Sequence, residues 1–169
     1  ISELVAAVRS YTQMDRASMQ HIDVTDGLDS TLVMLGHKLR GVTVVREYGT
    51  DVPMIDAYAG ELNQVWTNLI DNAVDAMDGS GTLRVATRVA AGEVVIEVGD
   101  NGRGMPPEVA ARAFEAFYTT KDVGHGTGLG LDIARRIIVE RHGGKISIDS
   151  RPGETTLRIE LPAQRPEPT

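Results

Sequence analysis

The strongest constraint on the fold is an amphipathic segment, residues 58–77, that two strand-like segments follow at once. Its apolar residues recur at three- and four-residue steps, which places them on one face of a helix: Leu62, Val65, Trp66, Leu69, Ile70, Ala73 and Met77. The turn Asp-Gly-Ser-Gly then ends the helix. Residues 82–89 and 93–100 are rich in β-branched side chains and predict a hairpin. A one-sided helix beside a hairpin predicts an α+β protein.

The segments before this helix predict one more helix and two more strands. A short strand is expected near His21, and a helix should begin with Thr25 or Asp26 as its cap and end near Gly41. Residues 42–48 have the composition of a strand.

The segments after the hairpin complete a two-layer sandwich. Residues 101–127 form a long Gly-containing connection with a short helix near 108–114, and such a connection is usually a functional lid or disordered. Residues 128–144 predict an amphipathic helix, and 145–150 with 155–162 predict a final strand pair. We expect a sheet of about five strands, mixed or antiparallel, with three helices on one face.

Composition and charge exclude several classes of function. Lys and Arg total 17 against 24 Asp and Glu, a net charge of -7, which argues against a nucleic-acid-binding surface. The chain has no cysteine, hence no disulfide framework and no thiolate metal site, which fits a cytoplasmic setting. No apolar run reaches the roughly 18 residues of a membrane span, so we expect no membrane contact by this chain.

Both ends of the chain carry separate expectations. Apolar residues within 1–17 fall on one helical stripe, which fits either a helix packed on its own domain or the end of a dimerising helical hairpin. The start at Ile1 lacks both Met and a secretory signal, so we interpret the chain as a fragment whose parent could be membrane-anchored. Residues 164–169 are expected to form a disordered tail.

Two asparagines on the long helix are the first candidates for chemistry. Asn68 and Asn72 project from the same face, about 6 Å apart along the axis. Amide oxygens are hard neutral ligands that suit Mg²⁺ when phosphate oxygens balance its charge. Two surface amides are the alternative, which the apolar surroundings disfavour because buried amides need partners.

A carboxylate at a strand end is the second candidate. Asp100 closes the segment 93–100 and could accept a hydrogen bond from an exocyclic amine such as adenine N6, while Gly102 and Gly104 allow close approach to a flat ring. A plain turn after a strand is an equally good interpretation of these residues alone.

A glycine-rich loop supports a nucleotide site. Residues 124–131, Gly-His-Gly-Thr-Gly-Leu-Gly-Leu, run into the predicted helix, so their backbone N–H groups and the helix dipole favour an anion. The spacing matches neither a P-loop nor the dinucleotide fingerprint. Lys121 could reach phosphate or be solvated, and the only phenylalanines, Phe114 and Phe117, would anchor the lid.

Four motifs in order resemble one family. NLIDNAVDA, DNGRGM, FEAFYTTK and GHGTGLGL resemble the N, G1, F and G2 boxes of the histidine-kinase branch of the gyrase, Hsp90, histidine kinase and MutL ATPase superfamily. The resemblance spans about residues 24–162 and includes closing strands typical of such kinases. It implies a Bergerat-type ATP-binding fold with ATP and Mg²⁺ as cofactors.

The resemblance also implies residue roles. Asn72 would coordinate Mg²⁺, Asn68 would contact phosphate or metal-bound water, and Asp100 would bind the adenine amine. Thr155 would support adenine through water, although Glu154 replaces a common glycine, and Ala116 replaces a frequent proline in the F box. Asn68 and Lys121 are the catalytic candidates. The other expected ATP-binding residues are Asp75, Gly102, Gly104, Met105, Phe117, Tyr118, Thr119, Thr120, Lys121, Gly124, His125, Gly126, Thr127, Gly128, Leu129, Gly130 and Leu131.

One position separates kinases from hydrolases in this superfamily. Hydrolysing members carry a glutamate one turn before the metal asparagine, where this chain has Asn68, and an amide cannot take a proton from water. Glu61 lies about 16 Å of helix from Asn72 and does not substitute. The site should hold ATP for an external nucleophile.

The nucleophile would be a histidine outside this chain. In the family it usually precedes an acidic residue on a helix, and His21, His37, His125 and His142 do not. We therefore expect residues 1–20 to end a dimerisation hairpin, residues 21–163 to form the ATP-binding domain, and the fragment to bind ATP without autophosphorylation.

The resemblance implies three partners: the phosphoacceptor domain, a response regulator and a second copy in the full-length protein. Three other functions stay open: an ATP-hydrolysing switch, a non-catalytic nucleotide-sensing module and a serine-directed kinase.

Overall fold

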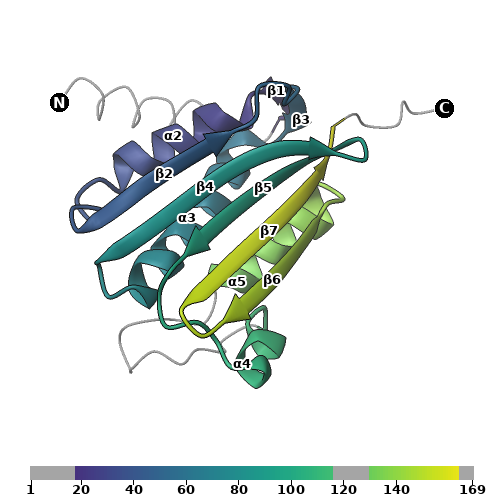
Figure 1. The fold of residues 1–169 in the computed structure, drawn as a ribbon. Coiled ribbons are helices and arrows are strands. Elements are labelled where there is room, and N and C mark those ends of the chain that lie inside the picture. Colours follow the sequence, from purple (N-terminus) through teal and green to yellow (C-terminus); the bar gives the residue numbers. More distant parts are fainter. Residues whose placement is uncertain (1–17, 116–129, 164–169) are drawn as a thin grey trace.

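The computed structural model describes residues 18–115 and 130–163, and expectations for 1–17, 116–129 and 164–169 lie outside it. Its main sheet has five strands in the order β2-β4-β5-β7-β6, and helices cover one face (Figure 1). Only β2 and β4 are parallel, so the sheet is mixed. The strands are β2 (Val42–Tyr48), β4 (Gly81–Ala90), β5 (Glu93–Asp100), β6 (Lys145–Arg151) and β7 (Glu154–Pro162).

Three helices form the second layer, as predicted: α2 (Val24–Met34), α3 (Ala59–Ala76) and α5 (Gly130–Arg135) (Figure 1). The core lies between this layer and the sheet. The side chains that the helical periodicity selected, among them Leu62, Trp66 and Leu69, are all buried. Ala59, Asn63 and Val74 are buried as well and were not predicted. A large apolar side chain such as Leu62 contributes about 1.5–3 kcal/mol when it leaves water. The α+β two-layer sandwich is thus confirmed.

A small second sheet lies at one end of the molecule. β1 (Gln20–Ile22) pairs antiparallel with β3 (Ile55–Ala57). The strand near His21 was predicted, but its partner β3 was not.

Both predicted ends of α2 were wrong. The cap is Asp23, whose Oδ1 accepts hydrogen bonds from the Thr25 backbone N–H at 2.9 Å and the Thr25 hydroxyl at 2.7 Å. The helix ends at Met34 instead of near Gly41, with Leu35 as its C-cap. Short-range turn bonds replace the helical ladder over the following residues, such as Lys38 N–H to the Leu35 carbonyl at 2.9 Å.

The helix that follows the glycine-rich loop changes type midway. α5 continues as a π-helix, η1 (Arg136–Arg141), and His142 caps its end. The short helix predicted near 108–114 is present as α4 (Pro107–Arg112). Among the helices of the described residues, none combines the length and apolar character that a membrane crossing requires.

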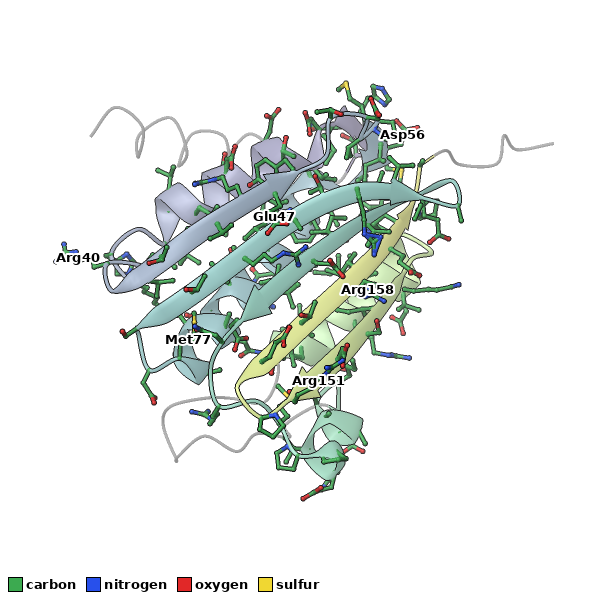
Figure 2. All side chains as sticks on the ribbon, viewed as in Figure 1. Arg40, Glu47, Asp56, Met77, Arg151 and Arg158 are labelled. Carbon is green, nitrogen blue, oxygen red and sulfur yellow. The ribbon has the colours of Figure 1, made fainter. Side chains whose placement is uncertain are left out.

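The sheet face away from the helices carries charged side chains, including Glu47 and Arg158 (Figure 2). Glu97, at the centre of β5, lies 3.1 Å from Arg158 Nε and 3.3 Å from Arg84 Nη1. Burial would raise the pKa of Glu97, but the hydrogen bonds and charges of Arg158 and Arg84 outweigh it and lower the pKa. This network joins β4, β5 and β7 on the uncovered face.

Candidate functional site

Asp100 ends β5, the middle strand of the sheet. Side chains alternate along a strand, so Asp100 continues the row of Ile96 and Val98 on the face toward the helices. The register places it between Leu83 of β4 and Thr155 of β7. Its carboxylate is buried, and Oδ1 accepts the Gly102 N–H at 2.9 Å. Burial raises the pKa of Asp100, and the Gly102 hydrogen bond and the Arg103 charge partly oppose this shift.

The turn after Asp100 packs tightly against two neighbours. A Cβ on Gly102 would collide with the Ala76 carbonyl at the end of α3, and one on Gly104 with the Arg151 carbonyl of β6. Gly104 also has a φ of 76°, which favours glycine. The Arg103 N–H donates to the Ala76 carbonyl at 3.2 Å. These contacts fix the turn between α3 and β6, so both predicted glycines have a packing role in this structure.

A cluster of hydroxyl groups adjoins Asp100. Thr155 of β7 is buried, and its Oγ1 lies 2.6 Å from Ser150 Oγ of β6. The Met105 backbone N–H donates to the same Ser150 Oγ at 2.8 Å. Thr155 and Met105 were predicted as site residues, but Ser150 was not, since a lone serine near a strand end carries no signal by itself.

The amides of α3 lie along the helix from this turn. Asn72 and Asn68 are half-buried and precede Ala76 by one and two turns, about 6 and 12 Å along the axis. Asn68 Nδ2 donates to the Gly130 carbonyl at 2.9 Å, and its Oδ1 accepts from Gln64 Nε2 at 2.7 Å. Asn68 therefore ties α3 to the first residue of α5. The sequence offered no reason to choose Gln64.

Four elements thus meet at the candidate site: the C-terminal half of α3, the end of β5 with its turn, the β6–β7 hairpin and the start of α5. Leu131, also predicted as a site residue, is buried, and Asp75 is exposed on α3. The remaining predicted residues, Phe117, Tyr118, Thr119, Thr120, Lys121, Gly124, His125, Gly126, Thr127, Gly128 and Leu129, lie outside the described residues.

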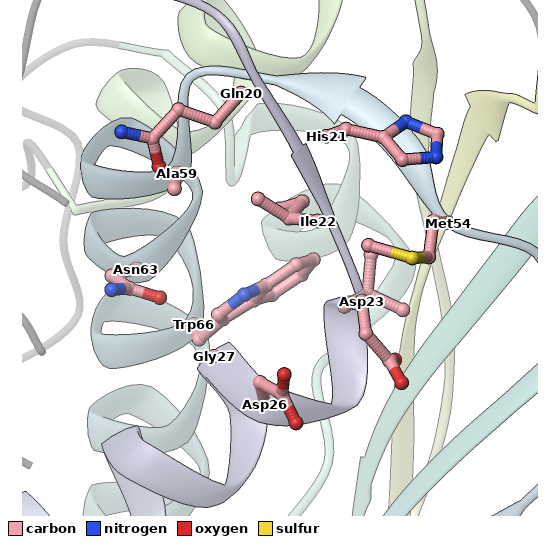
Figure 3. Close-up of a pocket in the computed structure, with 11 residues that line it drawn as sticks. Gln20, His21, Ile22, Asp23, Asp26, Gly27, Met54, Ala59, Asn63 and Trp66 are labelled. Atoms are coloured by element: carbon pink, nitrogen blue, oxygen red, sulfur yellow. The ribbon is translucent and has the colours of Figure 1, made fainter.

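A separate cavity of about 250 Å³ lies at the other end of α3 (Figure 3). β1, the start of α2, Met54 and the α3 residues Ala59, Asn63 and Trp66 line it. None of the predicted site residues contributes to this cavity.

Comparison with known proteins gives consistent matches. Residues 58–165 match the model of the family described as histidine kinase-, DNA gyrase B-, and HSP90-like ATPase. The chain is 33% identical to the sensory histidine kinase/phosphatase NtrB of Rhodobacter capsulatus, over 96% of this chain and 49% of that protein. It is 40% identical to sporulation kinase C of Bacillus subtilis over 67% of this chain and 26% of that protein. The chain thus spans half or less of these relatives.

Solved structures agree with the sequence matches. The catalytic domain of histidine kinase ThkA superposes with a TM-score of 0.79 at 28% identity, covering 87% of this chain and 97% of that one. Full-length ShkA, solved in complex with AMPPNP, superposes with a TM-score of 0.76 at 27% identity, over 94% of this chain and 35% of that one.

Proposed function

Because the chain belongs to the histidine kinase-, DNA gyrase B-, and HSP90-like ATPase family, we propose that it is the catalytic domain of a sensor histidine kinase. In this proposal it binds ATP with Mg²⁺ and directs the γ-phosphoryl group to a histidine on another segment. The kinase activity of the whole protein is part of the proposal, since the chain spans only part of its relatives.

The observation that carries the proposal is the neutral amide at position 68. Asn68 is held by Gln64 on one side and by the Gly130 carbonyl on the other, so it contributes a fixed dipole and no proton acceptor strong enough to activate water. A site of this kind stabilises the bound triphosphate and leaves the attack to an external nucleophile. This favours a kinase over a hydrolysing switch.

The adenine base would bind at the end of β5. Asp100 uses Oδ1 for the Gly102 N–H, and Oδ2 is the oxygen we assign to the adenine amine. Thr155 stands opposite Asp100 in the register of β5 and β7, on the same face of the sheet. The buried surroundings of both side chains strengthen a hydrogen bond to a ligand, since competing water is reduced.

The donor groups along α3 fit a magnesium ion shared with phosphates. The Asn72 amide oxygen is a hard, neutral ligand. Along α3, Asn72 lies between Asn68 and Ala76, the helix end nearest the proposed adenine site. When bound, Mg²⁺ would neutralise charge on the phosphate oxygens. We assign the metal contact to Asn72, and the phosphate contacts to Asn68, Lys121 and the glycine-rich loop.

The geometry of His142 supports an acceptor histidine elsewhere. Its Nε2 accepts the Tyr58 N–H at 3.0 Å, and its Nδ1 lies 2.8 Å from the Ile137 carbonyl, so both ring nitrogens are engaged within a buried side chain. His21 is exposed and paired with Asp56 at 3.0 Å, on a strand and not on a helix. We therefore propose that the acceptor belongs to a dimerisation hairpin. We also propose that this domain is cytoplasmic and that the full-length protein is a homodimer that signals to a response regulator.

The test is calorimetric titration of the chain with ATP, with Mg²⁺ present or chelated, while phosphate release is followed in the same samples. We expect Mg²⁺-dependent binding and almost no phosphate release. Sustained phosphate release would favour the hydrolysing switch instead, and a lack of ATP binding would refute the proposal.

A further inference from the structure

We propose that Ser150 fixes the direction of the hydrogen bonds in the base pocket and thereby favours adenine over guanine. The inference rests on the proposed ATP site and adds a specificity-determining residue to it.

The Ser150 hydroxyl has three neighbours. The Met105 N–H donates to Ser150 Oγ at 2.8 Å. The Thr155 hydroxyl oxygen lies 2.6 Å away, and the Glu154 carbonyl 3.4 Å away. A backbone N–H can only donate, so the contact with Met105 has a fixed direction.

Within the protein, the hydroxyl proton of Ser150, which is partly buried, has two oxygens in reach. The 2.6 Å contact with Thr155 lies within the range of good O–H···O hydrogen bonds, whereas the 3.4 Å contact with Glu154 lies beyond it. If Thr155 donated to Ser150, the Ser150 proton would be left with the poor partner. The proton of Ser150 therefore goes to Thr155 Oγ1, and Thr155 keeps its own proton for the pocket.

This arrangement forms a directed chain from Met105 through Ser150 to Thr155, in which each hydrogen bond polarises the next. Thr155 and Asp100 are directly opposite each other on neighbouring strands, where side chains are about 5 Å apart at Cβ. The pocket thus presents an acceptor, the Asp100 carboxylate, beside a donor, the Thr155 hydroxyl.

Adenine matches this pair and guanine does not. Adenine offers an amine donor at N6 beside an acceptor at N1, whereas guanine offers an acceptor at O6 beside a donor at N1. With guanine, O6 would face the Asp100 carboxylate. Both groups are acceptors, so no hydrogen bond could form between them. Ser150 acts on the base only through Thr155, whose hydroxyl it keeps free to donate, so it is a positioning residue.

The test measures the affinities of Mg-ATP and Mg-GTP by calorimetry for the wild type, Ser150→Ala, Thr155→Val and the double variant. Losing one neutral hydrogen bond should lower the ATP-to-GTP preference of Ser150→Ala by about fivefold to tenfold. Ser150→Ala should change ATP affinity by less than about twofold when Thr155 is already valine, because its effect passes through Thr155.

Two controls keep the test decisive. Ser150→Thr retains the hydroxyl and should keep the ATP preference. Thr155→Val leaves the Met105–Ser150 bond in place and should lower the preference by the same factor, so the test stands even if Ser150→Ala is unstable.

Equal loss of ATP and GTP affinity in Ser150→Ala, or a full effect in the Thr155→Val background, would overturn the inference while leaving ATP binding intact. Failure of the wild type to bind ATP would overturn the proposed function instead.

Discussion

Replacing Asp100 by asparagine should weaken ATP binding strongly and leave the fold intact. The two side chains have the same size, and the Gly102 N–H, 2.9 Å from Oδ1, requires an acceptor. The amide oxygen of the asparagine should therefore occupy the place of Oδ1. Its NH₂ group then takes the place of Oδ2, where two donors would meet if the adenine amine bound there.

The loss of affinity follows from the hydrogen bond removed. A hydrogen bond to a charged group contributes about 1.5–3 kcal/mol, and an unpaired amine adds a desolvation cost of similar size. Even the lower end of the total, about 3 kcal/mol, corresponds to roughly a 100-fold increase in Kd for ATP.

Without nucleotide, Asp100→Asn should not lower the free energy of unfolding. Burial raises the pKa of Asp100 in the folded state, so the folded protein disfavours the ionised carboxylate. Stability linked to this group is complete at low pH and is lost as pH rises from the unfolded pKa through the folded pKa. At pH 7.5 the wild type carries this penalty and the asparagine variant does not. The melting temperature without nucleotide should therefore stay equal or rise.

The assay is calorimetry with Mg-ATP at pH 7.5, combined with thermal unfolding in the absence of nucleotide. Asp51→Asn, the same chemical change at an exposed turn residue, is the matched control and should affect neither measurement. An Asp100→Asn variant that binds ATP within threefold of the wild type would refute the assignment of the base pocket. A melting temperature lowered by more than about 5 °C would instead show that the carboxylate supports the fold.

Three further predictions follow from the contacts of the site and the sheet. Asn72→Ala should abolish the Mg²⁺ dependence of ATP binding in a magnesium titration. Gly102→Ala should destabilise the protein by about 2 kcal/mol in urea unfolding, because the new Cβ collides with the Ala76 carbonyl; Gly99→Ala, whose nearest neighbour would be 3.5 Å away, should cost less. The pKa of Glu97 is lowered in the folded state. The stability that Glu97 contributes is therefore present above its ordinary pKa of 4.5 and is lost as pH falls through the folded pKa. In Glu97→Gln, the free energy of unfolding should fall less between pH 6 and pH 3 than in the wild type.

The parts of the fold that the sequence predicted are those with long, regular patterns. α3 shows its apolar face over five turns, and β4 with β5 is rich in β-branched residues, so both elements appear nearly as expected. β3 is defined by its pairing with β1, which a sequence does not display. The cap of α2 had to be chosen among neighbouring polar side chains by backbone angles that a sequence does not display either.

The π-helical turns of η1 end in a residue with a tertiary contact. The His142 ring bonds to the Ile137 carbonyl and to the first residue before α3, a partner that is distant in the sequence. Periodicity indicates a helix there but does not distinguish its type.

The candidate site was predicted from residues whose type carries chemistry and, for Thr155 and Met105, from the resemblance to a family. Asp100, Asn68 and Asn72 stand out as polar groups within apolar segments. Ser150 belongs to the candidate site only because the strand register pairs it with Thr155, and Gln64 belongs to it only because it donates to Asn68. Such relations arise from the pairing of elements, so a single sequence does not reveal them.

The strand order also determines when the pocket can form during folding. β6 and β7 are joined by the two residues Pro152 and Gly153, so this hairpin closes locally. Its pairing with β5, as between Glu97 and Arg158, joins residues 61 positions apart, and such distant contacts form late. Ser150 and Thr155 arrive with that hairpin, after the short-range contacts around α3 and Asp100. A nascent chain would therefore position Asn68 and Asn72, the proposed phosphate and metal contacts, before Thr155 completes the proposed base pocket beside Asp100.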